Sequence, residues 1–142
     1  ILECWERLDR PDVGPIFVAG IAPAWLNVVD MPAIQEATDR PVIGVSFEAS
    51  EGLSDAIERE FDGDECAERL AVYRRQPDRE AVTVSGENDA GDGETLYCRF
   101  LGIDPDEGRK LVRSYTPAGS GRPEPVRVAR LAARAADEWR RA

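Results

Sequence analysis

The sequence predicts an α/β fold in a single domain spanning residues 1–142. Two short apolar runs, Ile16–Ala19 and Pro41–Phe47, have the continuous hydrophobicity of buried strands, and a helical segment separates them. A strand, a short helix and a second strand within about 35 residues form a βαβ unit, in which the two strands are parallel. Two later segments, Ala81–Gly86 and Thr95–Leu101, alternate in polarity and favour a hairpin. The predicted sheet is therefore mixed and flanked by helices.

The first half of the chain contains signals for one helix on each side of the first strand. Apolar residues at helical spacing in 1–8 predict a helix that Pro11 ends. We expect the first strand to cover Val13–Gly20 and to be central in a parallel sheet, because its apolar run indicates burial on both faces. After an irregular loop, Asp30 supplies an N-cap acceptor and Pro32 fits the first turn of a helix that reaches about Thr38.

Four further helices follow from capping and spacing. Ser54 starts a helix to Phe61, and Asp64 is the expected cap of the next helix. The predicted hairpin carries an acidic, glycine-rich loop at Glu87–Glu94. A third helix starts at Asp104 with proline in its first turn. A last helix, starting near Glu124, has one apolar stripe, formed by Val128, Leu131, Ala132, Ala135 and Trp139.

Charge and composition limit the functions that the chain can have. The formal net charge is −10, which argues against a dominant nucleic-acid footprint but leaves a local basic patch open. Lys110 is the only lysine, and such an acidic, lysine-poor composition resembles that of proteins in salt-accumulating archaea. The sequence contains no histidine, so imidazole acid–base chemistry and imidazole metal ligands are excluded within it.

Cysteine use and hydropathy predict the cellular address. Cys4, Cys66 and Cys98 are widely spaced and odd in number, which favours reduced, buried thiols over a disulfide or a metal site. We see neither an apolar run of about 20 residues nor a signal peptide, and we expect a cytoplasmic protein without a membrane span. Because the sequence starts at Ile1, in what looks like the end of an amphipathic helix, we expect that an upstream segment is missing.

The loop after the first strand is the first candidate site, since ligands of α/β sheets bind beyond the carboxyl ends of strands. It begins at Gly20 and ends at Asp30. Asp30 and Asn27 offer oxygen atoms to a metal or a substrate, although Asp30 is equally explained as a helix cap. Trp25 has the aromatic surface to stack on a base, and the simpler alternative is that it belongs to the core.

Two charged segments provide weaker candidates. The acidic loop has carboxylates for a hard cation, but their order departs from the EF-hand pattern and a solvated loop explains them. Arg127 and Arg130 belong to a series of arginines at helical spacing on the last helix, which suits phosphate contacts. Arginines opposite an apolar stripe are also what any surface helix shows.

The segment GIAPAWLNVVD at Gly20–Asp30, the strand PVIGVSF and the final PEPVRVARLAARAA at Pro123–Ala136 carry a family resemblance. They resemble the archaeal endonuclease dU family, also called domain-of-unknown-function family ninety-nine, which is distantly similar to endonuclease V. The resemblance covers nearly the whole chain. It implies an RNase H-like, endonuclease V-like fold and Mg²⁺-dependent cleavage of DNA beside a deaminated base, with Asp30 as a catalytic residue and metal ligand.

The chain departs from this family pattern at two polar positions. Ala19 stands where the family has an aspartate at the end of the strand, and Arg130 stands where it has a histidine. We therefore expect a member that has lost the standard catalytic site and binds nucleic acid or a protein partner through Gly20, Trp25, Asn27, Arg127 and Arg130. The alternative is an active Mg²⁺-dependent endonuclease that cleaves DNA at uracil or inosine. In the non-catalytic case no cofactor is expected.

Overall fold

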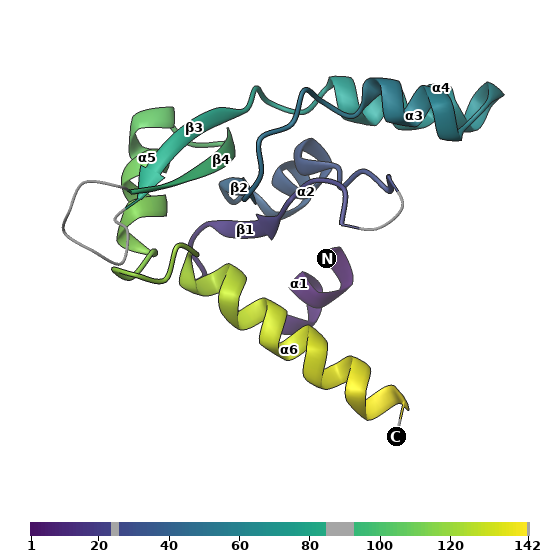
Figure 1. The fold of residues 1–142 in the computed structure, drawn as a ribbon. Helices are drawn as coiled ribbons and strands as arrows, with labels where there is room; N and C mark the ends of the chain where they lie inside the picture. The colour runs from purple at the N-terminus through teal and green to yellow at the C-terminus, as the bar shows by residue number, and fades with distance from the viewer. Residues whose placement is uncertain (24–25, 85–92, 142) are drawn as a thin grey trace.

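A computed structural model describes residues 1–23, 26–84 and 93–141 of the chain. It has a four-stranded sheet with helices on both sides (Figure 1). The strands are β1 (Ile16–Ala19), β2 (Val42–Ser46), β3 (Glu80–Val84) and β4 (Glu94–Leu101). The helices are α1 (Leu2–Leu8), α2 (Met31–Thr38), α3 (Ser54–Glu60), α4 (Gly63–Arg74), α5 (Pro105–Ser114) and α6 (Glu124–Arg141). The predicted α/β class, a mixed sheet flanked by helices, is confirmed, whereas the finer likeness to RNase H stays a prediction.

The sheet has the order β1-β2-β4-β3. β1 and β2 are parallel, with Ile16 opposite Val42, and α2 connects them as the predicted βαβ unit. β3 and β4 form the predicted antiparallel hairpin. The expectation of a central first strand is wrong, because β1 lies at an edge and only Val18 of its residues is buried. β2 is the strand with four consecutive buried residues.

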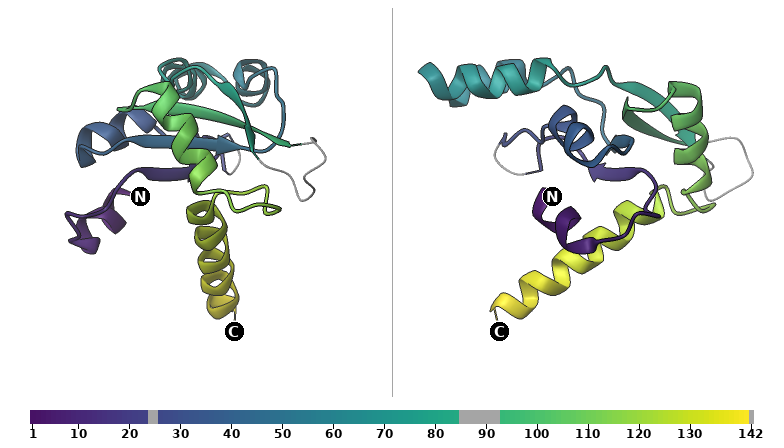
Figure 2. Two further views of the ribbon diagram at one scale, coloured as in Figure 1. Left: turned by 90° about the vertical axis from the view of Figure 1, so that its left-hand side faces the viewer. Right: turned by 180° about the vertical axis from the view of Figure 1, so that it is seen from behind.

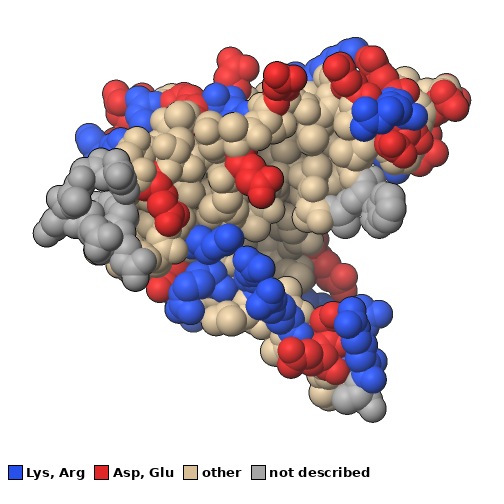
Figure 3. All heavy atoms as spheres, viewed as in Figure 1, with Lys and Arg blue, Asp and Glu red and all other residues tan. Residues whose placement is uncertain are grey.

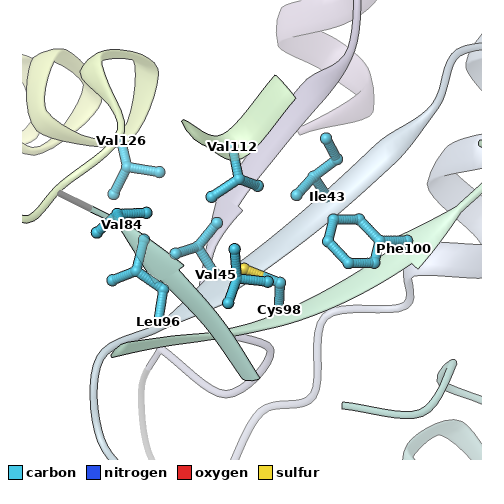
Figure 4. Packing of buried hydrophobic residues seen from close by; sticks show 9 residues of the cluster. Ile43, Val45, Val84, Leu96, Cys98, Phe100, Val112 and Val126 are labelled. Atoms are coloured by element: carbon cyan, nitrogen blue, oxygen red, sulfur yellow. The ribbon is translucent and has the colours of Figure 1, made fainter. Parts of the chain in front are cut away.

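One face of the sheet packs against α5 and the start of α6. Side chains from β2, β3 and β4 form the cluster there, together with Val112 of α5 and Val126 of α6 (Figure 4). The alternation predicted for β4 is confirmed, since Leu96, Cys98 and Phe100 all point into this cluster. Gly108 of α5 lies so close to Phe100 that an added Cβ would come within 2.4 Å of the ring.

The opposite face packs against α2. Val18 of β1 and Val42 of β2 contact Met31 and Ile34 of that helix. The start of α2 follows the sequence prediction closely. The Asp30 carboxylate accepts a hydrogen bond of 3.3 Å from the Ala33 N–H, and the helix begins with Pro32 in its first turn.

Two helical parts project from the sheet in different directions, the pair α3–α4 and the helix α6 (Figures 1 and 2). The cap of α4 is Asp62, without a side-chain bond, and the predicted cap Asp64 lies inside the first turn. No residue of α1 is buried, and of the apolar face predicted for it only Trp5 is partly covered. Among the described residues, no helix combines the length and the apolar character needed to cross a membrane.

Candidate functional site

A cleft of about 910 Å³ opens at the carboxyl ends of β1 and β2. Ala19 and Gly20 after β1, and Ser46 and Phe47 at the end of β2, form its floor. Gly20 has a left-handed backbone with φ of 76°, and its N–H donates a 2.7 Å hydrogen bond to the Val45 carbonyl. The chain therefore leaves the sheet at Gly20 through a turn that glycine adopts without strain, and this turn borders the cleft.

Five arginines line the cleft, and they come from separate parts of the chain. They are Arg74 of α4, Arg79 before β3, Arg99 of β4, Arg122 before α6 and Arg130 of α6. The acidic residues of the cleft are Glu48, Glu51 and Asp78. Cations thus outnumber anions in this cleft, although the whole chain has a net charge of −10.

Four of these arginines form no ion pair with any carboxylate among the described residues, namely Arg79, Arg99, Arg122 and Arg130. Nine other arginines of the chain do form such pairs, so pairing is common in this protein. Space-filling atoms show basic side chains gathered along the start of α6, beside the hollow in the surface (Figure 3). The cleft therefore holds more positive than negative charge, and four of its arginines lie beyond ion-pair distance of the described carboxylates.

Aromatic rings and backbone carbonyls orient three of the four guanidinium groups. Arg122 lies 4.0 Å from the centre of the Phe47 ring. Arg79 lies 5.0 Å from the centre of the Tyr97 ring and donates to the Ser50 carbonyl. Such stacking fixes the plane of a guanidinium group and leaves its remaining N–H donors available to a ligand.

Arg99 is a half-buried side chain of the cleft. It extends from β4 on the face opposite Cys98, donates to the Pro77 carbonyl and lies 6.0 Å from the centre of the Tyr73 ring. Burial is the largest cause of a lowered pKa of Arg99, and the neighbouring Arg79 also lowers this pKa, whereas Tyr73 and Asp78 act in the opposite direction. Since a guanidinium group stays protonated in proteins, Arg99 remains a cation beneath the cleft.

Of the residues predicted for the site, the structure brings Gly20 and Arg130 into the cleft. Asp30 does not line it. Its carboxylate caps α2 and forms an ion pair with Arg75 at the end of α4. Arg127 is also absent from the lining and pairs with Glu124 at 2.8 Å within α6.

The remaining predicted residues lie elsewhere or outside the described part. Asn27 lines a separate pocket of about 220 Å³, where its side-chain oxygen accepts a 3.5 Å hydrogen bond from Arg69. Trp25 and most of the acidic loop, residues 87–92, lie outside the described residues. The three cysteines are free, but only Cys98 is buried, whereas Cys4 is exposed and Cys66 is partly exposed.

The described residues do not fit a magnesium site around Asp30. Mg²⁺ prefers several oxygen ligands in octahedral geometry. Within residues 1–23, 26–84 and 93–141, no three acidic or cysteine side chains are grouped closely enough to hold a metal ion. A metal at Asp30 would also compete with the Arg75 guanidinium and the helix cap for the same carboxylate.

Sequence reasoning missed most of the arginines of the cleft. The alternation of β4 held a usable signal, because once Leu96 and Cys98 point to the core, Tyr97 and Arg99 must share the opposite face. Arg122 offered no comparable signal, since it lies in the glycine-rich stretch before α6 and meets Phe47 only through the tertiary fold.

This chain is similar to a described protein family and to several archaeal proteins. A family profile described as Endonuclease dU matches residues 1–137. A UPF0215 protein of Pyrobaculum calidifontis is 31% identical over 135 residues, which cover 94% of this chain and 69% of that protein. A UPF0215 protein of Archaeoglobus fulgidus is 32% identical over 127 residues, covering 89% of this chain and 62% of that protein.

A solved structure agrees with the fold. The crystal structure of a protein of unknown function from Archaeoglobus fulgidus has a TM-score of 0.65 and 25% sequence identity to this chain. The match covers 87% of this chain and 64% of that one. The chain therefore spans about two thirds of the length of these relatives.

Proposed function

The chain belongs to the endonuclease dU family, and from this membership we propose that its arginine-lined cleft binds nucleic acid, with DNA as the first candidate. The observation that carries the proposal is the presence of four arginines without a carboxylate partner in one cleft, among the described residues of a chain rich in paired arginines. Phosphate groups are the polyanionic ligands that planar guanidinium donors recognise best.

The overall acidity of the chain does not oppose this binding. The affinity for nucleic acid comes from local phosphate neutralisation and the release of condensed counterions. Charges elsewhere on the surface are screened beyond about 8 Å at physiological ionic strength. The arginines of the cleft therefore act on a bound phosphate group more strongly than the distant acidic side chains do.

The aromatic rings of the cleft support the same ligand class. Tyr73 and Phe47 line it, and each faces a guanidinium group. Bases stack on arginine planes as well as on aromatic rings, and this stacking is tolerant of sequence. We infer that the cleft contacts the phosphate backbone and one or more unpaired bases.

We further propose that binding occurs without cleavage by the standard family site. Ala19 lies on the floor of the cleft and supplies no carboxylate, and Arg130 supplies a fixed cation in place of a histidine. The Asp30 carboxylate caps α2 and forms an ion pair with Arg75, so we assign it a structural role. The second candidate function is cleavage of DNA at deoxyuridine, which the name of the matched family supports.

Binding and cleavage are separable in one experiment. Labelled oligonucleotides with and without a uracil or hypoxanthine base are titrated with the protein, and fluorescence anisotropy gives the affinity at several salt concentrations. Parallel samples with Mg²⁺ are analysed on denaturing gels. We expect salt-dependent binding without strand cleavage. Cleavage that Asp30→Asn abolishes would replace the binding role with the endonuclease role.

Charge-reversal variants locate the binding site. Arg79→Glu and Arg122→Glu change separate parts of the cleft, and Arg59→Glu is the matched control because it reverses an exposed arginine on α3 outside the cleft lining. Each cleft variant is expected to lower the affinity at least about tenfold and to reduce the salt slope by about 0.7 to 0.9 for each phosphate group that the variant no longer neutralises. Equal effects of all three variants would reject the cleft as the site.

A further inference from the structure

The apolar stripe of α6 is exposed to solvent. Its members, named here the outer stripe, are Val128, Leu131, Ala132, Ala135 and Trp139. Val128 and Leu131 each keep 53% of their surface exposed, and Trp139 keeps 82%. Only Val126 of the 18 residues of this helix is buried. A helix of this length is marginal in water when nothing packs on it, and aligned exposed apolar side chains mark an interaction surface.

The outer stripe faces away from the body of the protein. Successive helical residues turn by about 100°, which places Val126 and Arg130 on the side of α6 roughly opposite Val128. Val126 is buried in the core and Arg130 lines the cleft, so that side meets the rest of the chain. The C-terminal part of the helix extends clear of the sheet in every view (Figures 1 and 2), which leaves the stripe accessible.

We propose that the outer stripe packs against the outer stripe of a second copy of this chain, with the two α6 helices antiparallel about a twofold axis. An antiparallel register sets Val128 opposite Trp139 of the second copy, and Ala132 opposite its Ala135. Large side chains then meet smaller ones at both ends, while alanines at the centre let the helices approach closely.

The charges beside the stripe favour this partner and this direction. On one flank Arg127 lies near the start of the stripe and Glu138 near its end. The antiparallel register brings Arg127 next to Glu138 of the second copy, and the twofold axis repeats the pair. In a parallel arrangement this flank would instead face the opposite flank of the second copy, which carries Ala129 and Ala136, and the pair would not form.

The contact predicts a weak dimer. From Val128 to Trp139 the stripe is about 16 Å long, which is shorter than an interface of standard size needs. The dissociation constant is therefore expected in the micromolar range, and the assembly depends on protein concentration.

Sedimentation velocity without nucleic acid tests the dimer independently of the cleft. Samples from about 2 to about 200 µM bracket the expected dissociation constant. The average mass should rise from the monomer value of 15.7 kDa toward twice that value. Leu131→Glu should remain monomeric, whereas the matched control Ala133→Glu, which adds the same charge to the same helix outside the stripe, should dimerise like the wild type. Circular dichroism verifies that both variants keep the helix.

A charge exchange tests the register. Arg127→Glu and Glu138→Arg should each weaken the dimer at least about fivefold, because each places like charges together twice. The double variant should recover most of the wild-type affinity. A wild-type chain that stays monomeric over the whole range overturns the proposal, and so does a dimer that Leu131→Glu leaves intact. Binding of anionic vesicles by a monomer that Leu131→Glu prevents would instead assign the stripe to a membrane surface.

Discussion

Replacing Asp30 separates its structural role from a catalytic one. The carboxylate caps α2 through the Ala33 N–H and pairs with Arg75, whose side chain is 54% exposed. Loss of an N-cap acceptor costs about 1 kcal/mol. The ion pair is discounted to about 0.5 kcal/mol because Arg75 is largely in water. Asp30→Ala should therefore lower the free energy of unfolding by about 1.5 kcal/mol.

Asp30→Asn removes the charge but keeps the capping oxygen. Asparagine is as good an N-cap as aspartate, so only the ion pair is lost and the cost is about 0.5 kcal/mol. For a chain of this size the two variants should melt about 5 °C and about 2 °C below the wild type. Thermal and urea unfolding followed by circular dichroism measure both values. Equal destabilisation by the two substitutions would refute the capping role.

Adding Mg²⁺ tests the alternative role of Asp30, that its carboxylate binds a metal ion. A metal that binds only the folded state raises its stability in proportion to the logarithm of the metal concentration over the dissociation constant. With Asp30 engaged by Arg75, we expect about 10 mM Mg²⁺ to leave the melting temperature of the wild type unchanged. Stabilisation by Mg²⁺ that disappears in Asp30→Asn would show that the carboxylate binds the ion, and it would favour the endonuclease role.

Two further predictions concern the core. Gly108→Ala should destabilise the protein by about 2 kcal/mol in urea unfolding, because the overlap of the new Cβ with the Phe100 ring outweighs the gain of about 1 kcal/mol in helix propensity. The control Gly14→Ala should be neutral or slightly stabilising, because a Cβ added at Gly14 would meet nothing within 4 Å. Cys98 should resist a thiol reagent until the protein unfolds, whereas exposed Cys4 should react at once. Burial raises the pKa of Cys98 to about 12, so stability should fall as the pH rises above about 9, where the unfolded thiol ionises. Fast labelling of two thiols in the folded Cys4→Ser variant would contradict the protected state of Cys98.

Local signals predicted the elements well where side chains and backbone chemistry act within a few residues. Asp30 followed by Pro32 fixed the start of α2, and the alternation of β4 fixed which residues enter the core. The position of β1 in the sheet could not be obtained in this way. A continuous apolar run describes the hydrophobicity of a strand but not its neighbours, and β1 pairs only with β2 within the described sheet.

The position of the candidate cleft follows from the sequence more readily than the residues that line it do. The expectation that a site follows the first strand agrees with the cleft at Gly20, because the carboxyl ends of parallel strands meet at one edge. Its arginines could not be predicted from spacing along the chain. Arg79, Arg99 and Arg122 are distant from that loop in sequence, and they meet only when β4 pairs with β2 and the chain returns to α6.

For nucleic-acid binding, the distribution of charge over this protein matters more than its net charge. A net charge of −10 weakens a nucleic-acid hypothesis when the charges are spread evenly. Here most acidic contacts are made with arginines outside the cleft, such as Glu80 with Arg109 and Glu65 with Arg69, and those pairs neutralise each other locally. Four of the arginines that form no ion pair among the described residues line the cleft where the strands end, so a chain of net negative charge still contains a cleft suited to phosphate groups.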